Sequence, residues 1–145
     1  MDDLDQLVRR VDEDRWLASR FAPAAVRERL IAVYAVNYEI ARTAEIVNEG
    51  ALGEIRLEWW REALAEICDG KSPRPHPALV AFAAAHRHTP FSWPVIDRII
   101  TARRLGLERE PFETRWNFDD YVGATAGAVM RLAIEACGGS LADEA

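Results

Sequence analysis

Two glutamates at the end of an apolar helical segment have the residue type and spacing that fit metal chemistry. Glu45 and Glu49 are four residues apart, so on a helix both carboxylates lie on one face and can share a divalent cation. Magnesium held in this way can balance negative charge on a bound ligand. Gly50 follows directly and is a candidate helix end, where both carboxylates can also be solvated surface groups. The spacing therefore leaves two interpretations open, a magnesium site and a solvated helix end.

Histidine, cysteine and serine offer no competing catalytic centre. His86 and His88 are two residues apart and point to different sides of a helix, while His76 lies in a proline-rich loop, which argues against zinc. Cys68 and Cys137 are far apart and form no C-x-x-C pair, a pattern typical of buried free thiols. The serines lack the sequence context of an activated nucleophile. We therefore expect neither covalent catalysis nor metal binding by histidine.

Composition and charge exclude several classes of partner. Of the 145 residues 50% are hydrophobic, which suits one folded domain. Lys and Arg number 18 against 24 Asp and Glu, a net charge of -6, so a nucleic-acid partner is not expected. The acidic N-terminus does not resemble an export signal, and no apolar run is long enough to span a bilayer. We expect a cytoplasmic protein, and peripheral association with the inner membrane stays open.

Apolar residues recur at helical spacing through the chain, and no segment alternates as a strand does. We therefore predict an all-α protein. Helices are expected over approximately residues 2–20, 23–48, 53–68, 77–87, 94–107 and 117–137. In the third of these, Leu57, Trp60, Leu64 and Ile67 form one apolar stripe that should face the core, and Arg56 lies one turn before Trp60, within reach of its indole.

Three sequence blocks resemble the squalene/phytoene synthase family. The block YAVNYEIARTAEIVNEG, residues 34–50, resembles the helix that carries the first metal-binding aspartates of the synthases. The block LGEIRLEWWREAL, residues 52–64, looks like a hallmark of a branch related to an assembly factor for mitochondrial respiratory complex I. The block YVGATAGAVMRLA, residues 121–133, resembles the family's Tyr-x-x-x-Val-Ala-Gly helix.

The resemblance implies that the first metal-binding carboxylate has been lost. Laid on this chain without a gap, the family's two aspartates fall on Ala41 and Glu45. Shifting the alignment by three residues places them on Ala44 and Asn48 instead. An alanine methyl group cannot ligate magnesium, so in either alignment Glu45 and Glu49 remain the only candidate metal ligands of this helix.

The same resemblance implies a groove for a prenyl chain or a similar apolar ligand. The positions expected to line it are Phe21, Tyr34, Tyr121, Gly123, Thr125, Ala126 and Gly127. Gly123 and Gly127 are four residues apart, so one helix face has almost no side-chain bulk. Such a face either lets a neighbouring helix pack closely or leaves room for a ligand.

From the resemblance we expect an all-α, isoprenoid-synthase-like helical array, with residues 1–145 forming the N-terminal portion of a single family domain. The implied function is that of a non-catalytic member that needs no cofactor. It would bind a partner protein or an isoprenoid-like lipid in a role of the respiratory-complex-assembly type. The alternative is a magnesium-dependent head-to-head prenyl transferase acting on prenyl diphosphates. A third possibility is a helical interaction module whose own side chains fill the groove.

Overall fold

The computed structural model describes residues 2–46, 50–108 and 110–139, and of residues 2 and 44–46 the backbone alone. Within these ranges the regular structure is entirely helical, which confirms the all-α prediction. The elements are α1 (Asp2–Val11), α2 (Glu13–Ser19), α3 (Ala24–Ile46), α4 (Gly50–Cys68), α5 (Pro77–His88), α6 (Trp93–Leu107), α7 (Arg115–Val122), the π-helical segment η1 (Gly123–Gly127) and α8 (Ala128–Ala136). None of the described helices is long and apolar enough to cross a membrane.

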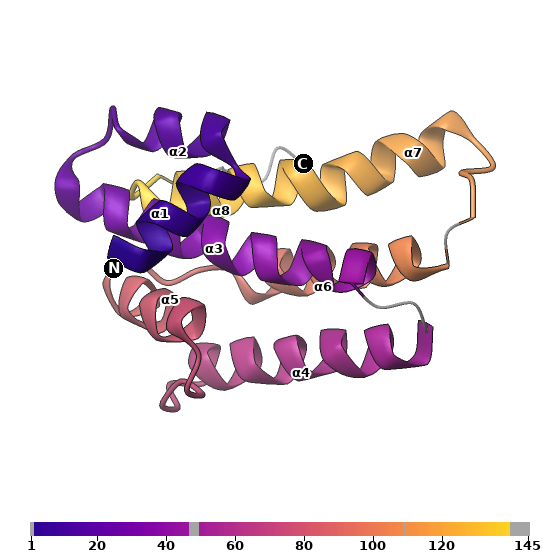
Figure 1. Ribbon diagram of the computed structural model, residues 1–145, viewed down its shortest axis with the longest axis horizontal. Coiled ribbons are helices and arrows are strands. Elements are labelled where there is room, and N and C mark those ends of the chain that lie inside the picture. The colour runs from indigo at the N-terminus through magenta and orange to yellow at the C-terminus, as the bar shows by residue number, and fades with distance from the viewer. Residues whose placement is uncertain (1, 47–49, 109, 140–145) are drawn as a thin grey trace.

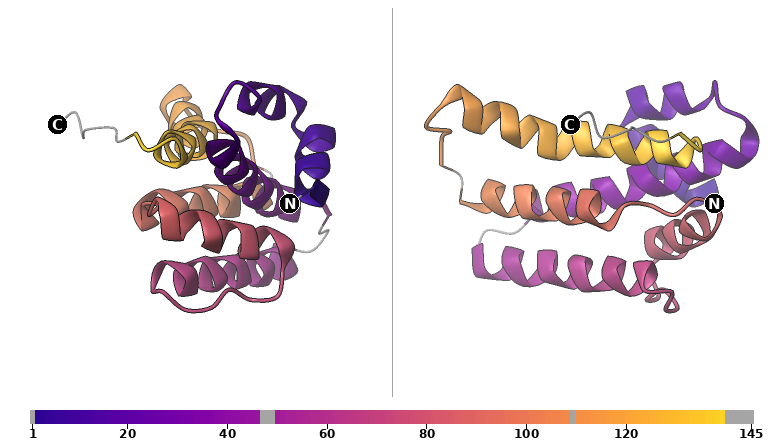
Figure 2. Two further views of the ribbon diagram at one scale, coloured as in Figure 1. Left: turned by 90° about the vertical axis from the view of Figure 1, so that its left-hand side faces the viewer. Right: turned by 180° about the vertical axis from the view of Figure 1, so that it is seen from behind.

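Helix α3 is the central element of the array. Every residue from Leu30 to Val36 is buried, so this stretch is covered on all sides. Its neighbours are α1, α2, α4, α5, α6 and α8. The end-on view in Figure 2 shows α3 between the α1–α2 pair, α8 and the helices α5 and α4. In Figure 1 α4 forms the lowest layer and the α7–α8 rod runs along the top.

The N-terminal segment forms two helices, not the single helix predicted over residues 2–20. Asp12 has φ -150 and ψ 65, outside the helical region, and the chain turns there. The turn brings Trp16 and Arg20 back to α1, where Trp16 Nε1 donates to Asp5 at 3.0 Å and Arg20 donates to Asp5 at 2.6 Å. Leu17 is 55% exposed as a result.

Helix α4 begins at Gly50, three residues before the predicted start at Gly53. Gly53 serves a different purpose, because a Cβ atom added to it would meet Leu107 Cδ2 at 2.8 Å. The glycine therefore allows α4 to pack closely on the end of α6. The predicted stop after Cys68 is confirmed, since Gly70 has a φ of 81 and takes the left-handed conformation that ends many helices.

The last helical segment starts at Arg115, two residues before the predicted start at Asn117. Thr114 caps it, because its hydroxyl accepts a hydrogen bond from the Asn117 backbone N–H at 3.1 Å. Val122 is 41% exposed, whereas Val129 is buried. Five π-helical residues, η1, interrupt the helix between these two positions.

The contacts of Asp5 generate a prediction about acid stability. Burial raises the pKa of Asp5, but hydrogen bonds from Trp16 and Arg20 and the charge of Arg20 outweigh it, so the pKa lies below its ordinary value. Its stabilising contribution is therefore present at neutral pH and is lost as pH falls through the folded-state pKa. Asp5→Ala should lower the free energy of unfolding by about 1–3 kcal/mol at pH 7.

Urea unfolding of wild type and variant at a series of pH values measures this difference. It should shrink toward zero between about pH 5 and about pH 2. Asp3→Ala, on the exposed side of the same helix, is the matched control and should change stability little. A destabilisation by Asp5→Ala that does not vary with pH would contradict the assignment.

Candidate functional site

The predicted metal face is the C-terminal part of α3. Its described position Ala41 is half-buried and offers only a methyl group. The side chains of Ala44 and Glu45, and Asn48 and Glu49 as a whole, lie outside the described residues. Among the described residues no group of three or more His, Cys, Asp and Glu could hold a metal ion. The described part of this face thus does not fit the implied magnesium cluster, and the Glu45–Glu49 site stays a prediction.

Tyr34, a predicted groove residue, is enclosed. Its side chain is 8% exposed, and the guanidinium of Arg15 from α2 lies 5.9 Å from the centre of its ring. Burial raises the pKa of the Tyr34 phenol, and the nearby charge of Arg15 partly opposes this effect. The phenol is therefore neutral at physiological pH. Helix α2 covers the groove wall at this point.

Asn37, one turn after Tyr34, presents a buried acceptor to the core. Its side-chain oxygen Oδ1 is inaccessible to solvent and has no hydrogen-bond partner among the described residues. It adjoins an apolar void of about 10 Å³, at the lower limit of what a single water needs. The void is otherwise lined by Val33, Val36, Ile40, Phe82, Ile96, Ile99 and Leu132. A buried acceptor without a partner costs stability, which marks Asn37 as a residue that packing alone does not explain.

Tyr121 and Thr125 of the predicted groove lie together at the start of the π-helical segment. The Thr125 hydroxyl donates to the Tyr121 backbone carbonyl at 2.8 Å, in the region where the regular helical pattern changes. The Tyr121 hydroxyl in turn accepts from Arg103 of α6 at 3.2 Å. Five-residue π segments of this kind often occur at functional sites.

The small residues that follow Tyr121 divide between two faces. Ala124 and Ala128 are buried at 4% and 1% exposure, and η1 packs against α6. Ala126 and Gly127 are exposed, and a Cβ added to Gly127 would find no atom closer than the Val122 carbonyl oxygen at 3.8 Å. Close packing therefore accounts for two of the alanines. Among the described residues, close packing does not account for the exposed pair Ala126 and Gly127.

Phe21, the remaining predicted groove residue, is 89% exposed in the turn between α2 and α3. That turn lies at the opposite end of the molecule from α7 (Figure 1). The structure thus brings Tyr121 and Thr125 together and leaves Phe21 apart from them. Of the two cysteines, both free, Cys68 is half-buried and Cys137 is exposed, so burial is only partly as expected.

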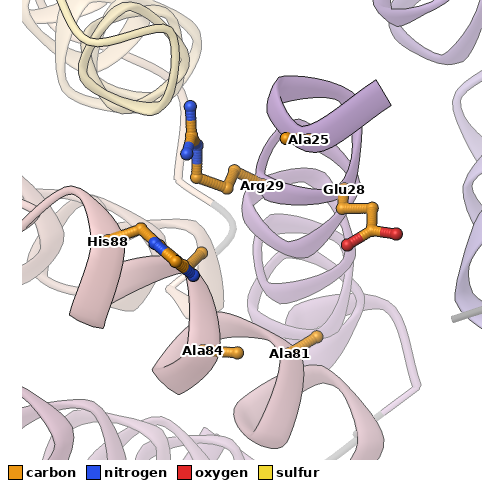
Figure 3. A pocket seen from close by; sticks show the side chains of 7 residues that line it. Ala25, Glu28, Arg29, Ala81, Ala84 and His88 are labelled. Carbon is orange, nitrogen blue, oxygen red and sulfur yellow. The ribbon is translucent and has the colours of Figure 1, made fainter. Parts of the chain in front are cut away.

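A hollow that sequence reasoning missed lies where α3 and α5 meet (Figure 3). It has a volume of about 230 Å³ and is lined by Ala25, Glu28, Arg29, Ala81, Ala84, Ala85 and His88. Arg29 reaches across to α8, where its Nε donates to the Ala136 carbonyl oxygen at 2.9 Å and so caps that helix. In the sequence, the alanines that line this hollow indicate only an ordinary apolar helix.

A second hollow lies between α3 and α4, beside the predicted metal face. It is lined by Glu39, Arg42, Thr43, Arg56, Trp59 and Trp60 and holds about 100 Å³. Arg42 forms an ion pair with Glu39 at 3.2 Å, so part of its charge is already balanced. Small-molecule pockets usually hold about 300–1,000 Å³. This hollow is therefore too small to enclose a long prenyl chain.

Comparison with known proteins identifies the family. The family model for squalene/phytoene synthase matches residues 8–145. The chain belongs to the squalene/phytoene synthase family. The family assignment agrees with the all-α array and with the expected resemblance of its sequence blocks. No solved structure matches the chain.

The curated relatives of this family member are assembly factors. The mouse protein named NADH dehydrogenase (ubiquinone) complex I, assembly factor 6 is 25% identical over 134 residues, which cover 92% of this chain and 40% of the relative. The bovine protein of the same name is likewise 25% identical, and the rat protein is 26% identical. The chain thus spans about 40% of the length of these relatives.

Several residues of the EIRLEWWREAL block, residues 54–64, stabilise the packing of α4 in this family member. Leu57, Trp60 and Leu64 are buried as predicted. Arg61 ties α4 to α6 through Asp97 at 3.1 Å and the Thr101 hydroxyl at 3.1 Å. The residues Glu54, Ile55 and Arg56 are exposed and make no such contact with another helix in the part of the chain that the structure describes.

The cation over an indole in this region comes from a different pair than the sequence indicated. Arg74, in the loop after α4, lies 5.2 Å from the centre of the Trp59 ring. Trp60, the expected partner of Arg56, packs edge-on against His76 at 5.1 Å. Arg74 also pairs with Glu66 at 2.8 Å, which lowers the pKa of that carboxyl. The loop is thereby fastened to the outer face of α4.

The unpartnered oxygen of Asn37 yields a stability prediction. Asn37→Leu replaces a buried polar group by an apolar one of similar size, so the free energy of unfolding should rise by about 1–2 kcal/mol. Chemical denaturation measures the change. Thr43→Val is the matched control, because the Thr43 hydroxyl is buried but donates to the Glu39 carbonyl at 3.1 Å, and its removal should not stabilise. A loss of stability in Asn37→Leu would show that Oδ1 has a partner in solution.

Proposed function

We propose that this chain is a non-catalytic member of the squalene/phytoene synthase family that acts by binding a protein partner, in the assembly of a respiratory complex. The observation that carries the proposal is Ala41, a methyl group at a position where the resemblance expects a metal-binding aspartate. Ionisation of a prenyl diphosphate needs a cation clamp, and a missing carboxylate weakens that clamp directly.

The relatives support the assembly role. The proteins that match over 92% of this chain are named as assembly factors of complex I, and their names describe no prenyl transfer. Because the chain spans about 40% of those proteins, the proposal concerns the role of the matched part. The small hollow of about 100 Å³ beside the predicted metal face supports binding over catalysis, since it cannot shield a prenyl cation from water.

A protein partner is favoured over an isoprenoid-like lipid. A net charge of -6 repels an anionic membrane surface, which opposes strong peripheral association. By contrast, large apolar side chains such as Trp116, 73% exposed, and Ile55, 66% exposed, are available to another protein. Lipid binding remains the alternative within the same non-catalytic role.

The first test is turnover. Purified protein supplied with farnesyl or geranylgeranyl diphosphate and magnesium should release no diphosphate and form no hydrocarbon. Glu45→Ala probes the substitute ligand, and Glu54→Ala on the exposed side of α4 is the matched control. Release that disappears in Glu45→Ala and persists in Glu54→Ala would establish the prenyl transferase alternative.

The second test is complementation. Cells that lack the gene for this chain should assemble less NADH:ubiquinone oxidoreductase, measured on native gels and by NADH oxidation. The wild type and the Glu45→Ala/Glu49→Ala double variant should restore assembly equally, because no bound metal is needed. Restoration by the wild type alone would overturn the non-catalytic role, and no loss of assembly on deletion would overturn the assembly role.

A further inference from the structure

Exposed apolar side chains gather where α6 ends and α7 begins. A hollow of about 310 Å³ lies there. We call it the acidic apolar hollow, and it is lined by Leu105, Glu108, Glu110, Pro111, Phe112, Glu113, Asn117 and Asp120. Leu105 is 55% exposed and Phe112 is 44% exposed. In Figure 1 this part of the chain lies at the right-hand end.

The described residues that line this hollow carry charge of one sign. The described lining carries four carboxylates and no cation. Asp120 is paired with Arg98 at 3.3 Å, but Glu108, Glu110 and Glu113 form no ion pair with the described residues. Over residues 105–122 the sequence contains five Asp or Glu against two Arg. Apolar surface framed by carboxylates that mostly lack an ion pair among the described residues is complementary to a ligand that is apolar and basic.

The hollow is held in shape before any ligand binds. Phe112 packs against Phe118 at 5.6 Å and against Tyr121 at 5.2 Å between ring centres. Arg98 and Arg103 of α6 hold α7 through Asp120 at 3.3 Å and the Tyr121 hydroxyl at 3.2 Å. A preformed site loses less conformational entropy on binding.

Helix α7 itself has no described partner that covers it. It contains no buried residue, although Trp116 and Phe118 are 73% and 49% exposed. Complete burial of one such side chain is worth about 1.5–3 kcal/mol, so exposing several is costly unless another molecule covers them. The face is therefore suited to an interface.

We propose that the acidic apolar hollow docks an amphipathic helix of a partner protein. A bulky apolar side chain would insert between Leu105 and Phe112, and Lys or Arg on either side would pair with Glu110 and Glu113. The inference names the surface for the proposed binding role and rests on that role. An anionic membrane is disfavoured by the same carboxylates, and so is a second copy meeting this face with its own identical negative surface.

A pair of synthetic peptides tests the proposal on the full chain. The Leu/Lys peptide is a helix with leucine on one face and lysine on the other, and in the Leu/Glu peptide every lysine is replaced by glutamate. Titration calorimetry should show the Leu/Lys peptide binding at least about tenfold more tightly, and more weakly as salt is raised. Equal binding of both peptides, or binding of neither, would overturn the proposal.

Matched variants locate the site. Glu110→Gln/Glu113→Gln and Leu105→Ser should each weaken binding of the Leu/Lys peptide by about tenfold. Their controls are Glu28→Gln/Glu54→Gln, exposed carboxylates elsewhere, and Val80→Ser, which is 52% exposed on α5. The controls should bind as the wild type does, and equal losses in the controls would overturn the assignment to this hollow.

Two further measurements distinguish other occupants. Sedimentation should show no self-association that Leu105→Ser abolishes, and phosphatidylcholine vesicles should not retain the protein through this face. A positive result in either would overturn the proposal in favour of a second copy or a lipid surface. Diphosphate release in the turnover assay would instead overturn the proposed function, so the two failures are distinguishable.

Discussion

The enclosure of α3 is the constraint on which the rest of the array depends. Every residue from Leu30 to Val36 is buried, and six other helices contact α3. Helix α3 therefore positions all six of these helices. Complete coverage ends one residue later, at Asn37, whose oxygen has no partner within the described ranges, and Ala41 beyond it is half-buried. Beyond this stretch α3 is buried on one side only, because Ile40 and Thr43 are 1% and 3% exposed whereas Ala41, where the resemblance expects a metal ligand, is half-buried.

Much of the fold could be predicted from local pattern, and the differences come from long-range contacts. The stripe Leu57, Trp60 and Leu64 was predictable because its spacing matches the helical period. The break at Asp12 was not, because it is stabilised by hydrogen bonds to Asp5 that only the folded chain brings together. The predicted helix start at Gly53 was wrong for a similar reason. Gly53 packs against Leu107, a residue more than fifty positions away in the chain.

The candidate site was less predictable than the fold. Ala41 and the Tyr121–Thr125 block could be found because they align with family motifs. The enclosure of Tyr34 by Arg15 and the separate position of Phe21 depend on how α2 packs, which no motif encodes. The acidic apolar hollow was missed for a related reason. The sequence pattern predicts no helix between residues 107 and 117, and the lining of the hollow forms only when α6 and α7 are placed beside each other.

The central claim is that this polypeptide no longer holds the metal and diphosphate of a synthase. Its most direct test is the electron paramagnetic resonance spectrum of manganese, a substitute for magnesium, titrated with the protein in the presence of pyrophosphate. We expect the protein to leave the signal of manganese and pyrophosphate unchanged. Stoichiometric loss of that signal on adding the wild type, absent with Glu45→Ala, would contradict it.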